Sequence, residues 1–145
     1  MAYDTLTLAG STVFVSTIFM ILLHGLEWFH IGTLLHSQLP NALAYTVSSK
    51  LQVLKGELGI ETVCYFLLLV AFAVFFPSNL VLLTVIALLG LVHFQALVGG
   101  MRANWLQKLT AGRVAGLLVF DVLEIVFLLI LAFGFYPFFQ ALIRA

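Results

Sequence analysis

The stretch Ile21-Leu22-Leu23-His24-Gly25-Leu26-Glu27-Trp28-Phe29-His30 places a histidine and a carboxylate in an otherwise apolar run. The same placement recurs along the chain. All six lysines and arginines lie between the apolar runs, at their ends or in the C-terminal tail. Five of the six acidic residues lie inside those runs or at their ends, namely Glu27, Glu57, Glu61, Asp121 and Glu124. Carboxylates that lie in apolar runs without a lysine or arginine need another positively charged partner.

The composition predicts an integral membrane protein. Hydrophobic residues make up 63% of the 145 residues and charged residues 8%, with a mean hydropathy of +1.21. A soluble domain has about a quarter charged residues. Apolar runs of about twenty residues recur, which is the length that a helix needs to cross roughly 30 Å of hydrocarbon. A transmembrane barrel would show short alternating segments instead. The fold class is therefore all-α.

Turn residues divide the chain into four spans of a single membrane domain. Ser49 and Gln52 fit a capping box, and we expect them to open the second helix. Pro77 begins a connection so short that the third span must be the antiparallel neighbour of the second. We expect the fourth helix to end by Gly134, leaving 136–139 as an aromatic tail. The sequence thus predicts an antiparallel four-transmembrane-helix bundle with spans at approximately 6–35, 50–76, 80–98 and 112–134.

The distribution of bases predicts the orientation. The linkers after the first and third spans hold five of the six bases, Lys50, Lys55, Arg102, Lys108 and Arg113. By the positive-inside rule these linkers face the cytoplasm, and both termini of this multi-pass protein are non-cytoplasmic. Residues 1–4 carry no base, so we expect the first apolar run to be retained rather than cleaved as a signal.

At the membrane surface, Trp28 is expected to anchor the interface, with His30 and His36 nearer water.

This topology gathers polar side chains from all four spans at one depth, in the cytoplasmic leaflet. A charged group near the bilayer centre costs at least about 2.5–3.5 kcal/mol, so the acids need protons or a bound cation. Pairs three or four residues apart share one helix face: His24 with Glu27, Glu57 with Glu61, and Asp121 with Glu124.

The residue types favour a transition-metal ion. Imidazole with carboxylate suits iron, manganese or zinc, and helical bundles build such sites from inward Glu and His side chains. Glu27 and His30 have the Glu-x-x-His spacing of ferritin-like di-iron proteins, although a second copy is missing. We predict redox or hydrolytic chemistry on a hydrophobic substrate. In such a site, Glu57 would lie closer to water. The predicted ligands are His24, Glu27, Glu61, His93, Asp121 and Glu124.

Other interpretations fit the same residues. The chain could be a metal-free small subunit of a larger membrane complex, with its acids protonated or bonded to His24 and His93. Those two histidines could instead be the axial ligands of haem b. Acid–base isomerisation or hydrolysis of a lipid-like molecule is a further alternative. Proton or cation transport needs polar access from both sides, which the apolar outer half of the spans disfavours unless the chain forms a homo-oligomer.

Several classes are excluded by what the chain lacks. Cys64 is the single cysteine, which rules out an internal disulfide, a redox CxxC pair and a zinc site made of thiolates. No basic block is long enough to hold nucleic acid. Walker, dinucleotide, His-Glu-x-x-His and serine-elbow motifs are missing.

Overall fold

The chain folds into four long helices. The computed structural model describes residues 4–36, 43–102 and 111–144, with side chains for 4–29, 55–99, 116 and 118–144. Its helices are α1 (Thr5–His36), α2 (Leu43–Phe75), α3 (Leu80–Arg102) and α4 (Ala111–Arg144). Each contains a segment long and apolar enough to cross a membrane: Thr5–Phe29, Lys55–Phe75, Leu80–Gly99 and Leu118–Arg144. The prediction of an all-α chain with four such helices is confirmed.

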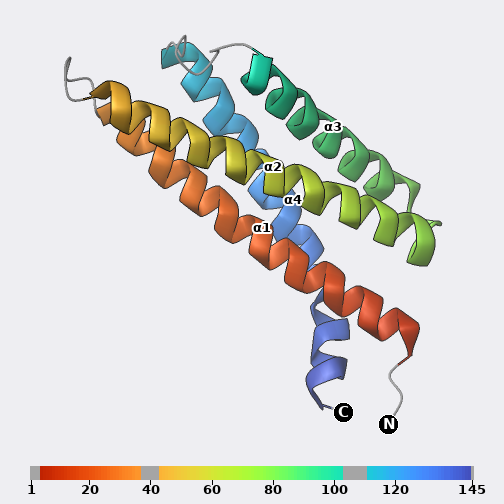
Figure 1. Cartoon of the computed structure of the whole chain (residues 1–145). Coiled ribbons are helices and arrows are strands. Elements are labelled where there is room, and N and C mark those ends of the chain that lie inside the picture. The colour runs from red at the N-terminus through yellow and green to blue at the C-terminus, as the bar shows by residue number, and fades with distance from the viewer. Residues whose placement is uncertain (1–3, 37–42, 103–110, 145) are drawn as a thin grey trace.

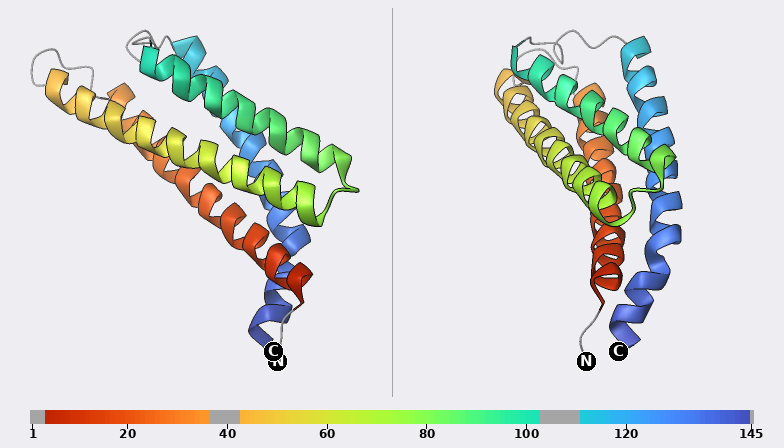
Figure 2. Two further views of the ribbon diagram at one scale, coloured as in Figure 1. Left: turned by 45° about the vertical axis from the view of Figure 1, so that its right-hand side comes forward. Right: turned by 90° about the vertical axis from the view of Figure 1, so that its right-hand side faces the viewer.

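The helices pack side by side. α1 packs against both α2 and α4, and α2 packs against α3 (Figure 1). The start of α1 and the end of α4 lie at one end of the molecule (Figure 1 and Figure 2). The end of α1, the start of α2, the end of α3 and the start of α4 lie at the other end. Residues late in α1 and α3 therefore come level with residues early in α2 and α4.

Short polar side chains begin two of the helices. The Thr7 backbone N–H donates to Asp4 Oδ1 at 2.5 Å, which caps α1. Hydrogen bonds from the Thr7 backbone and side chain lower the pKa of the Asp4 carboxyl from its ordinary value. At α3, the Leu82 backbone N–H donates to Asn79 Oδ1 at 3.4 Å. The short turn after Pro77 thus serves to start α3.

Two predicted helix boundaries are wrong near the linkers. α2 begins at Leu43, so Ser49 lies inside the helix and does not cap it. A capping box opens a helix only where the preceding residues leave the helical conformation, and here they do not. α3 continues beyond the predicted end at Val98 to Arg102, through Gly99 and Gly100, because glycine in a helix costs only about 1 kcal/mol.

α4 is also longer than predicted. It runs through Pro137 to Arg144, so the expected end at Gly134 and the separate aromatic tail at 136–139 are wrong. The aromatic side chains beyond Gly134 pack against α1, through Phe14, and against the end of α2. The Phe135 ring lies 5.4 Å from that of Phe72 and 5.0 Å from that of Phe76, measured between centroids. This burial offsets the local cost of a proline, which removes one backbone donor from the helix.

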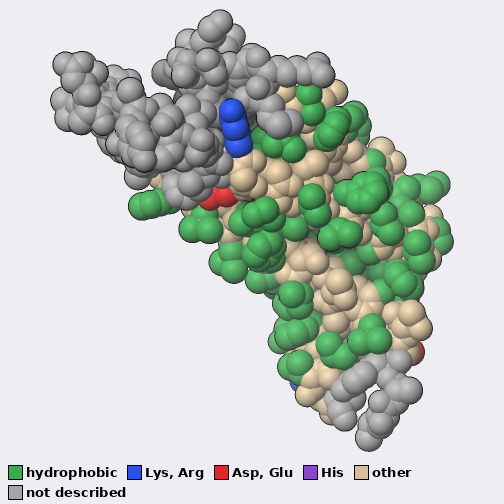
Figure 3. All heavy atoms as spheres, viewed as in Figure 1, with side chains coloured by type: hydrophobic (Ala, Val, Ile, Leu, Met, Phe, Trp, Pro, Cys, Tyr) green, Lys and Arg blue, Asp and Glu red, His purple; other side chains and the backbone are tan. Residues whose placement is uncertain are grey.

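The molecule is apolar outside and carries a polar group inside. Hydrophobic side chains cover much of the face seen in Figure 3, and Val81 and Phe133 are 74% and 77% exposed. The apolar core comes from all four helices: Val13, Met20, Tyr65, Leu68, Phe72, Ile86, Leu128, Leu131 and Phe135. The buried polar side chains are Ser11, Thr17, His24, Glu57, Glu61, His93, Asp121 and Glu124. A surface this apolar suits lipid rather than water.

Candidate metal centre

The structure brings all six predicted ligands together. α1 supplies His24 and Glu27, α2 supplies Glu61, α3 supplies His93, and α4 supplies Asp121 and Glu124. Five of them are buried, and Glu27 is half-buried. The predicted sharing of a helix face holds for the first pair, because His24 Nδ1 lies 3.6 Å from Glu27 Oε2. The helical phase read from sequence therefore places these side chains correctly, while their role as metal ligands stays a prediction.

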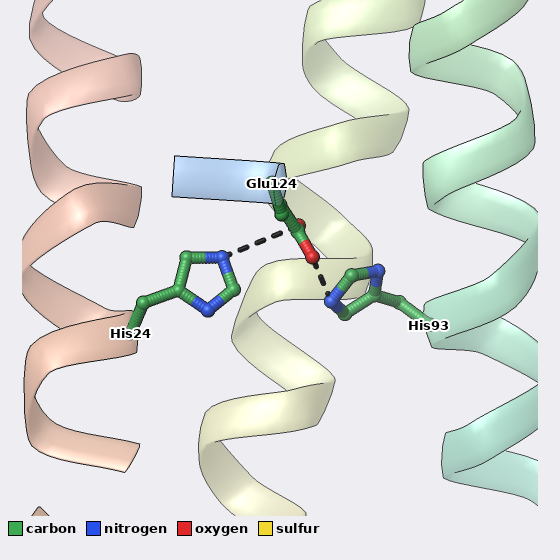
Figure 4. A group of neighbouring side chains, drawn as sticks. All are labelled: His24, His93 and Glu124. Carbon is green, nitrogen blue, oxygen red and sulfur yellow. Dashed lines mark ion pairs between the residues drawn. The ribbon is translucent and has the colours of Figure 1, made fainter. Parts of the chain in front are cut away.

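The Glu124 carboxylate lies between the two imidazoles (Figure 4). Its Oε1 is 3.2 Å from His24 Nε2 and 3.4 Å from His93 Nε2. The Tyr65 hydroxyl donates a hydrogen bond to the same oxygen. Glu124 Oε2 is buried and has no hydrogen-bond partner among the described residues. Three helices besides α4 therefore converge on this one carboxylate.

Glu61 forms a second bridge between the histidines. Its Oε1 lies 3.5 Å from His24 Nδ1, and its Oε2 lies 3.6 Å from His93 Nε2. Both Glu61 oxygens are buried without a hydrogen-bond partner in the part of the chain that is described. A buried carboxylate without hydrogen bonds is costly unless a positive charge compensates it. Glu61 therefore needs a proton or a cation close by.

The His93 ring is oriented by its own helix. His93 Nδ1 lies 2.8 Å from the Leu89 backbone carbonyl oxygen. A carbonyl oxygen only accepts hydrogen bonds, so Nδ1 carries a proton. Nε2 faces oxygens of Glu61 and Glu124, and it donates a proton to them in the charged ring or presents a lone pair in the neutral ring. Backbone bonding of one nitrogen to present the other is the usual arrangement of a metal-binding histidine.

Both ring nitrogens of His24 face carboxylates. Nε2 is directed toward Glu124, and Nδ1 toward Glu27 and Glu61. The ring is fully buried, and neither nitrogen makes a hydrogen bond within the described chain. Among the described side chains, His24 is thus the one with carboxylates near both nitrogens of its ring.

Asp121 lies near both His24 and Glu27 and is oriented by a tryptophan. The Trp28 indole N–H donates to Asp121 Oδ2 at 3.0 Å. Two sets of ligand atoms result, each with all its atoms within 4.8 Å of one another. One set is His24, His93 and Glu124, and the other is His24, Glu27 and Asp121. Either set has the residue types and spacing to hold a metal ion.

Two contributors were not predicted from the sequence. Tyr65 is four residues after Glu61, and that spacing alone indicates a shared helix face. Trp28 was expected as an interfacial anchor, and its 37% exposure is compatible with that position. Its indole N–H also donates a hydrogen bond to Asp121. Glu57, expected nearer water, is 7% exposed and so is buried. The side chains of His30 and His36 lie outside the described residues.

The charge of the cluster is unbalanced. Glu27, Glu61, Asp121 and Glu124 supply four carboxyl groups against the two imidazoles. Among the described side chains, the ion-pair partners of Glu27, Glu61 and Glu124 are His24 and His93, which are charged only when protonated. With its carboxyl groups ionised, the cluster would have a net negative charge, which protons or a bound cation would neutralise.

Comparison with known proteins adds no interpretation of this geometry. No protein-family model, curated protein or solved structure matches the chain.

Proposed function

We propose that the protein is a multi-pass membrane protein, an antiparallel four-span bundle with both termini outside, that binds a transition-metal ion between His24, His93 and Glu124. The apolar exterior and four helices of sufficient length support insertion into a bilayer. The start of α1 and the end of α4 lie at one end of the molecule, which supports an even number of crossings (Figure 1 and Figure 2).

One observation carries the metal proposal. His93 Nδ1 lies against the Leu89 carbonyl oxygen, and Nε2 faces Glu124 Oε1 at 3.4 Å and Glu61 Oε2 at 3.6 Å. In a neutral ring Nε2 carries a lone pair, which two buried carboxylate oxygens repel unless a positive charge lies between them. A metal ion supplies that charge and uses the same lone pair as a ligand, and a second proton on the ring is the alternative that metal analysis distinguishes.

The donor set suggests which metals fit. Two histidines and one carboxylate make up the set used by non-haem iron(II) sites and by catalytic zinc sites, both of which leave positions for further ligands. Glu61 lies beside both imidazoles and could complete the coordination. The Tyr65 hydroxyl orients the Glu124 carboxylate, as an outer-shell partner should.

The position of Glu124 favours a metal ion over haem. In a bis-histidine haem the iron lies between the two axial imidazoles, and the porphyrin occupies the plane around it. Here the Glu124 carboxylate lies between His24 and His93 (Figure 4). A haem would have to displace that carboxylate, whereas a metal ion can bind it.

The identity of the ion decides the chemistry. Iron or manganese would support oxidation or electron transfer, and zinc would support hydrolysis through activated water. A hydrophobic substrate is the natural partner, because a molecule dissolved in the bilayer meets the apolar faces of these helices first.

Elemental analysis of the detergent-purified protein tests the proposal, together with a visible absorption spectrum to detect haem. We expect about one iron, manganese or zinc ion per chain and no Soret band. His93→Gln should weaken binding by more than the about 10–100-fold lost with an outer-shell partner. Gln95→Ala, at an exposed position on the same helix, should leave the metal content unchanged.

His24 supports a second candidate, a metal-free subunit held together by buried ion pairs. A doubly protonated His24 would donate from Nε2 to Glu124 and from Nδ1 to Glu27 or Glu61, satisfying both nitrogens at once. This candidate predicts protein free of metal, with stability that falls when His24 is replaced by Gln. Stoichiometric metal lost in the His93→Gln variant would exclude it.

A further inference from the structure

We infer that Glu27, Asp121 and the Nδ1 side of His24 form an outer cation position through which the metal ion reaches the centre of His24, His93 and Glu124. This rests on the proposed function, because it assigns a loading route to that same centre. The atoms of the outer set lie within 4.8 Å of one another, as do those of the inner set, and His24 belongs to both.

The two sets differ in depth. Along α1, Glu27 lies three residues nearer than His24 to the helix end at His36, and along α4, Asp121 lies three residues nearer than Glu124 to the helix start at Ala111. At 1.5 Å per residue, each step is about 4.5 Å along its helix. The Glu27 side chain is 14% exposed, while that of Glu124 is 0% exposed. An ion arriving from the aqueous side therefore meets the outer set first.

His24 connects the two positions through its two nitrogens. Nδ1 lies 3.6 Å from Glu27 Oε2, and Nε2 lies 3.2 Å from Glu124 Oε1. His24 Nδ1 is buried without a hydrogen-bond partner among the described residues. A neutral imidazole offers one lone-pair nitrogen at a time. His24 can therefore serve one position and then the other, provided that the Nε2 proton passes to the adjacent Glu124 carboxylate and Nδ1 takes a proton from Glu27 as the ion moves. Such an exchange suits transfer of a single ion better than two permanent ions.

Trp28 is a positioning residue of the outer set. Its indole N–H donates to Asp121 Oδ2 at 3.0 Å, which orients the carboxylate near Glu27 and His24. Two carboxylates at the mouth of a low-dielectric site focus the field on an approaching cation, and such focusing raises association rates by about 10–10³-fold. The outer set should therefore control how fast the centre fills.

The test measures the rate and the extent of Mn²⁺ uptake by chelator-treated, full-length protein in detergent. The double variant Glu27→Gln, Asp121→Asn keeps side-chain size, and the asparagine can still accept from Trp28. We expect it to take up Mn²⁺ at least about tenfold more slowly than the wild type. The final metal content should be the same. The control is Glu57→Gln, which removes a buried carboxyl outside both sets and should leave the rate unchanged.

Each outcome is decisive. An unchanged rate in the double variant, or equal slowing in Glu57→Gln, would overturn the loading position and leave the centre in place. The double variant could instead have wild-type circular dichroism but a lower final metal content. That result would assign Glu27 and Asp121 to the centre itself and would contradict the loading role. A wild-type protein that binds no metal would overturn the proposed function instead.

Discussion

At the scale of single residues, Tyr65 supports the proposed centre through a single atom, its hydroxyl oxygen. Its hydroxyl is the hydrogen-bond donor to Glu124 Oε1. Tyr65→Phe keeps the ring, which is buried in the core, and removes only that donor. We expect a loss of about 1–3 kcal/mol in unfolding free energy, because a buried acceptor loses its partner. Metal affinity should fall by about 10–100-fold.

Denaturant unfolding in detergent and metal titration measure these two effects. Tyr136→Phe is the matched control, because Tyr136 is 43% exposed and contacts the Phe14 ring with its own ring, which phenylalanine retains. Equal behaviour of the Tyr65 and Tyr136 variants would contradict a specific role for the Tyr65 hydroxyl.

At the scale of helices, Gly90 sets how closely α3 approaches α2. A Cβ added at Gly90 would lie 3.2 Å from Tyr65 Cβ, a contact tighter than packed side chains normally make. Gly90→Val should therefore destabilise the protein by about 1–3 kcal/mol through overpacking. It should also weaken metal binding, since it displaces the helix that carries His93 and the side chain that holds Glu124.

Thermal unfolding of the variants checks this expectation. Gly134→Ala is the control, since a Cβ there meets nothing within 4 Å and alanine is the better helix former. A Gly90→Val variant as stable as Gly134→Ala would show that α2 and α3 are not in close contact at Gly90.

The helices also show how far sequence reasoning reaches. Runs of apolar residues locate all four helices, because bilayer thickness and helical rise fix the length required. Helix ends are harder. Ser49 forms a plausible cap and yet lies inside α2, and Pro137 lies inside α4 because Phe135 packs across the interface. Local patterns cannot report such tertiary contacts.

For the site, helical phase and depth identify the inward-facing acids and histidines, but not their individual contacts. Which oxygen of Glu124 meets which nitrogen depends on the rotation of each helix about its axis, and the sequence does not determine it. Tyr65 and Trp28 were missed for the same reason, since both are ordinary residues of a membrane helix until their partners are known.

At the scale of the whole molecule, the proposed centre of His24, His93 and Glu124 would connect α1, α3 and α4, and Glu61 and Tyr65 of α2 contact its residues. A ligand that binds only the folded protein stabilises it by about 2.7 kcal/mol when its free concentration is 100 times Kd. We expect added Mn²⁺ or Zn²⁺ to raise the unfolding temperature of chelator-treated wild-type protein. Glu124→Gln should abolish this rise, whereas an equal rise in that variant would place the ion elsewhere.

The orientation in the membrane is a second prediction at this scale. The bases in the linkers predict that both ends of the chain are outside. Alkaline phosphatase fused after residue 145 should be active in a bacterial host, and green fluorescent protein fused there should be dark. The reverse pattern would invert the topology and place the polar centre in the outer leaflet.

The most direct measurement is an anomalous difference map from crystals of the purified protein, collected at the absorption edge of the metal found by elemental analysis. We predict a single strong peak within coordination distance of His24 Nε2, His93 Nε2 and the Glu124 carboxylate. A map with no peak among these three side chains, or with metal confined to the molecular surface, would contradict the central claim.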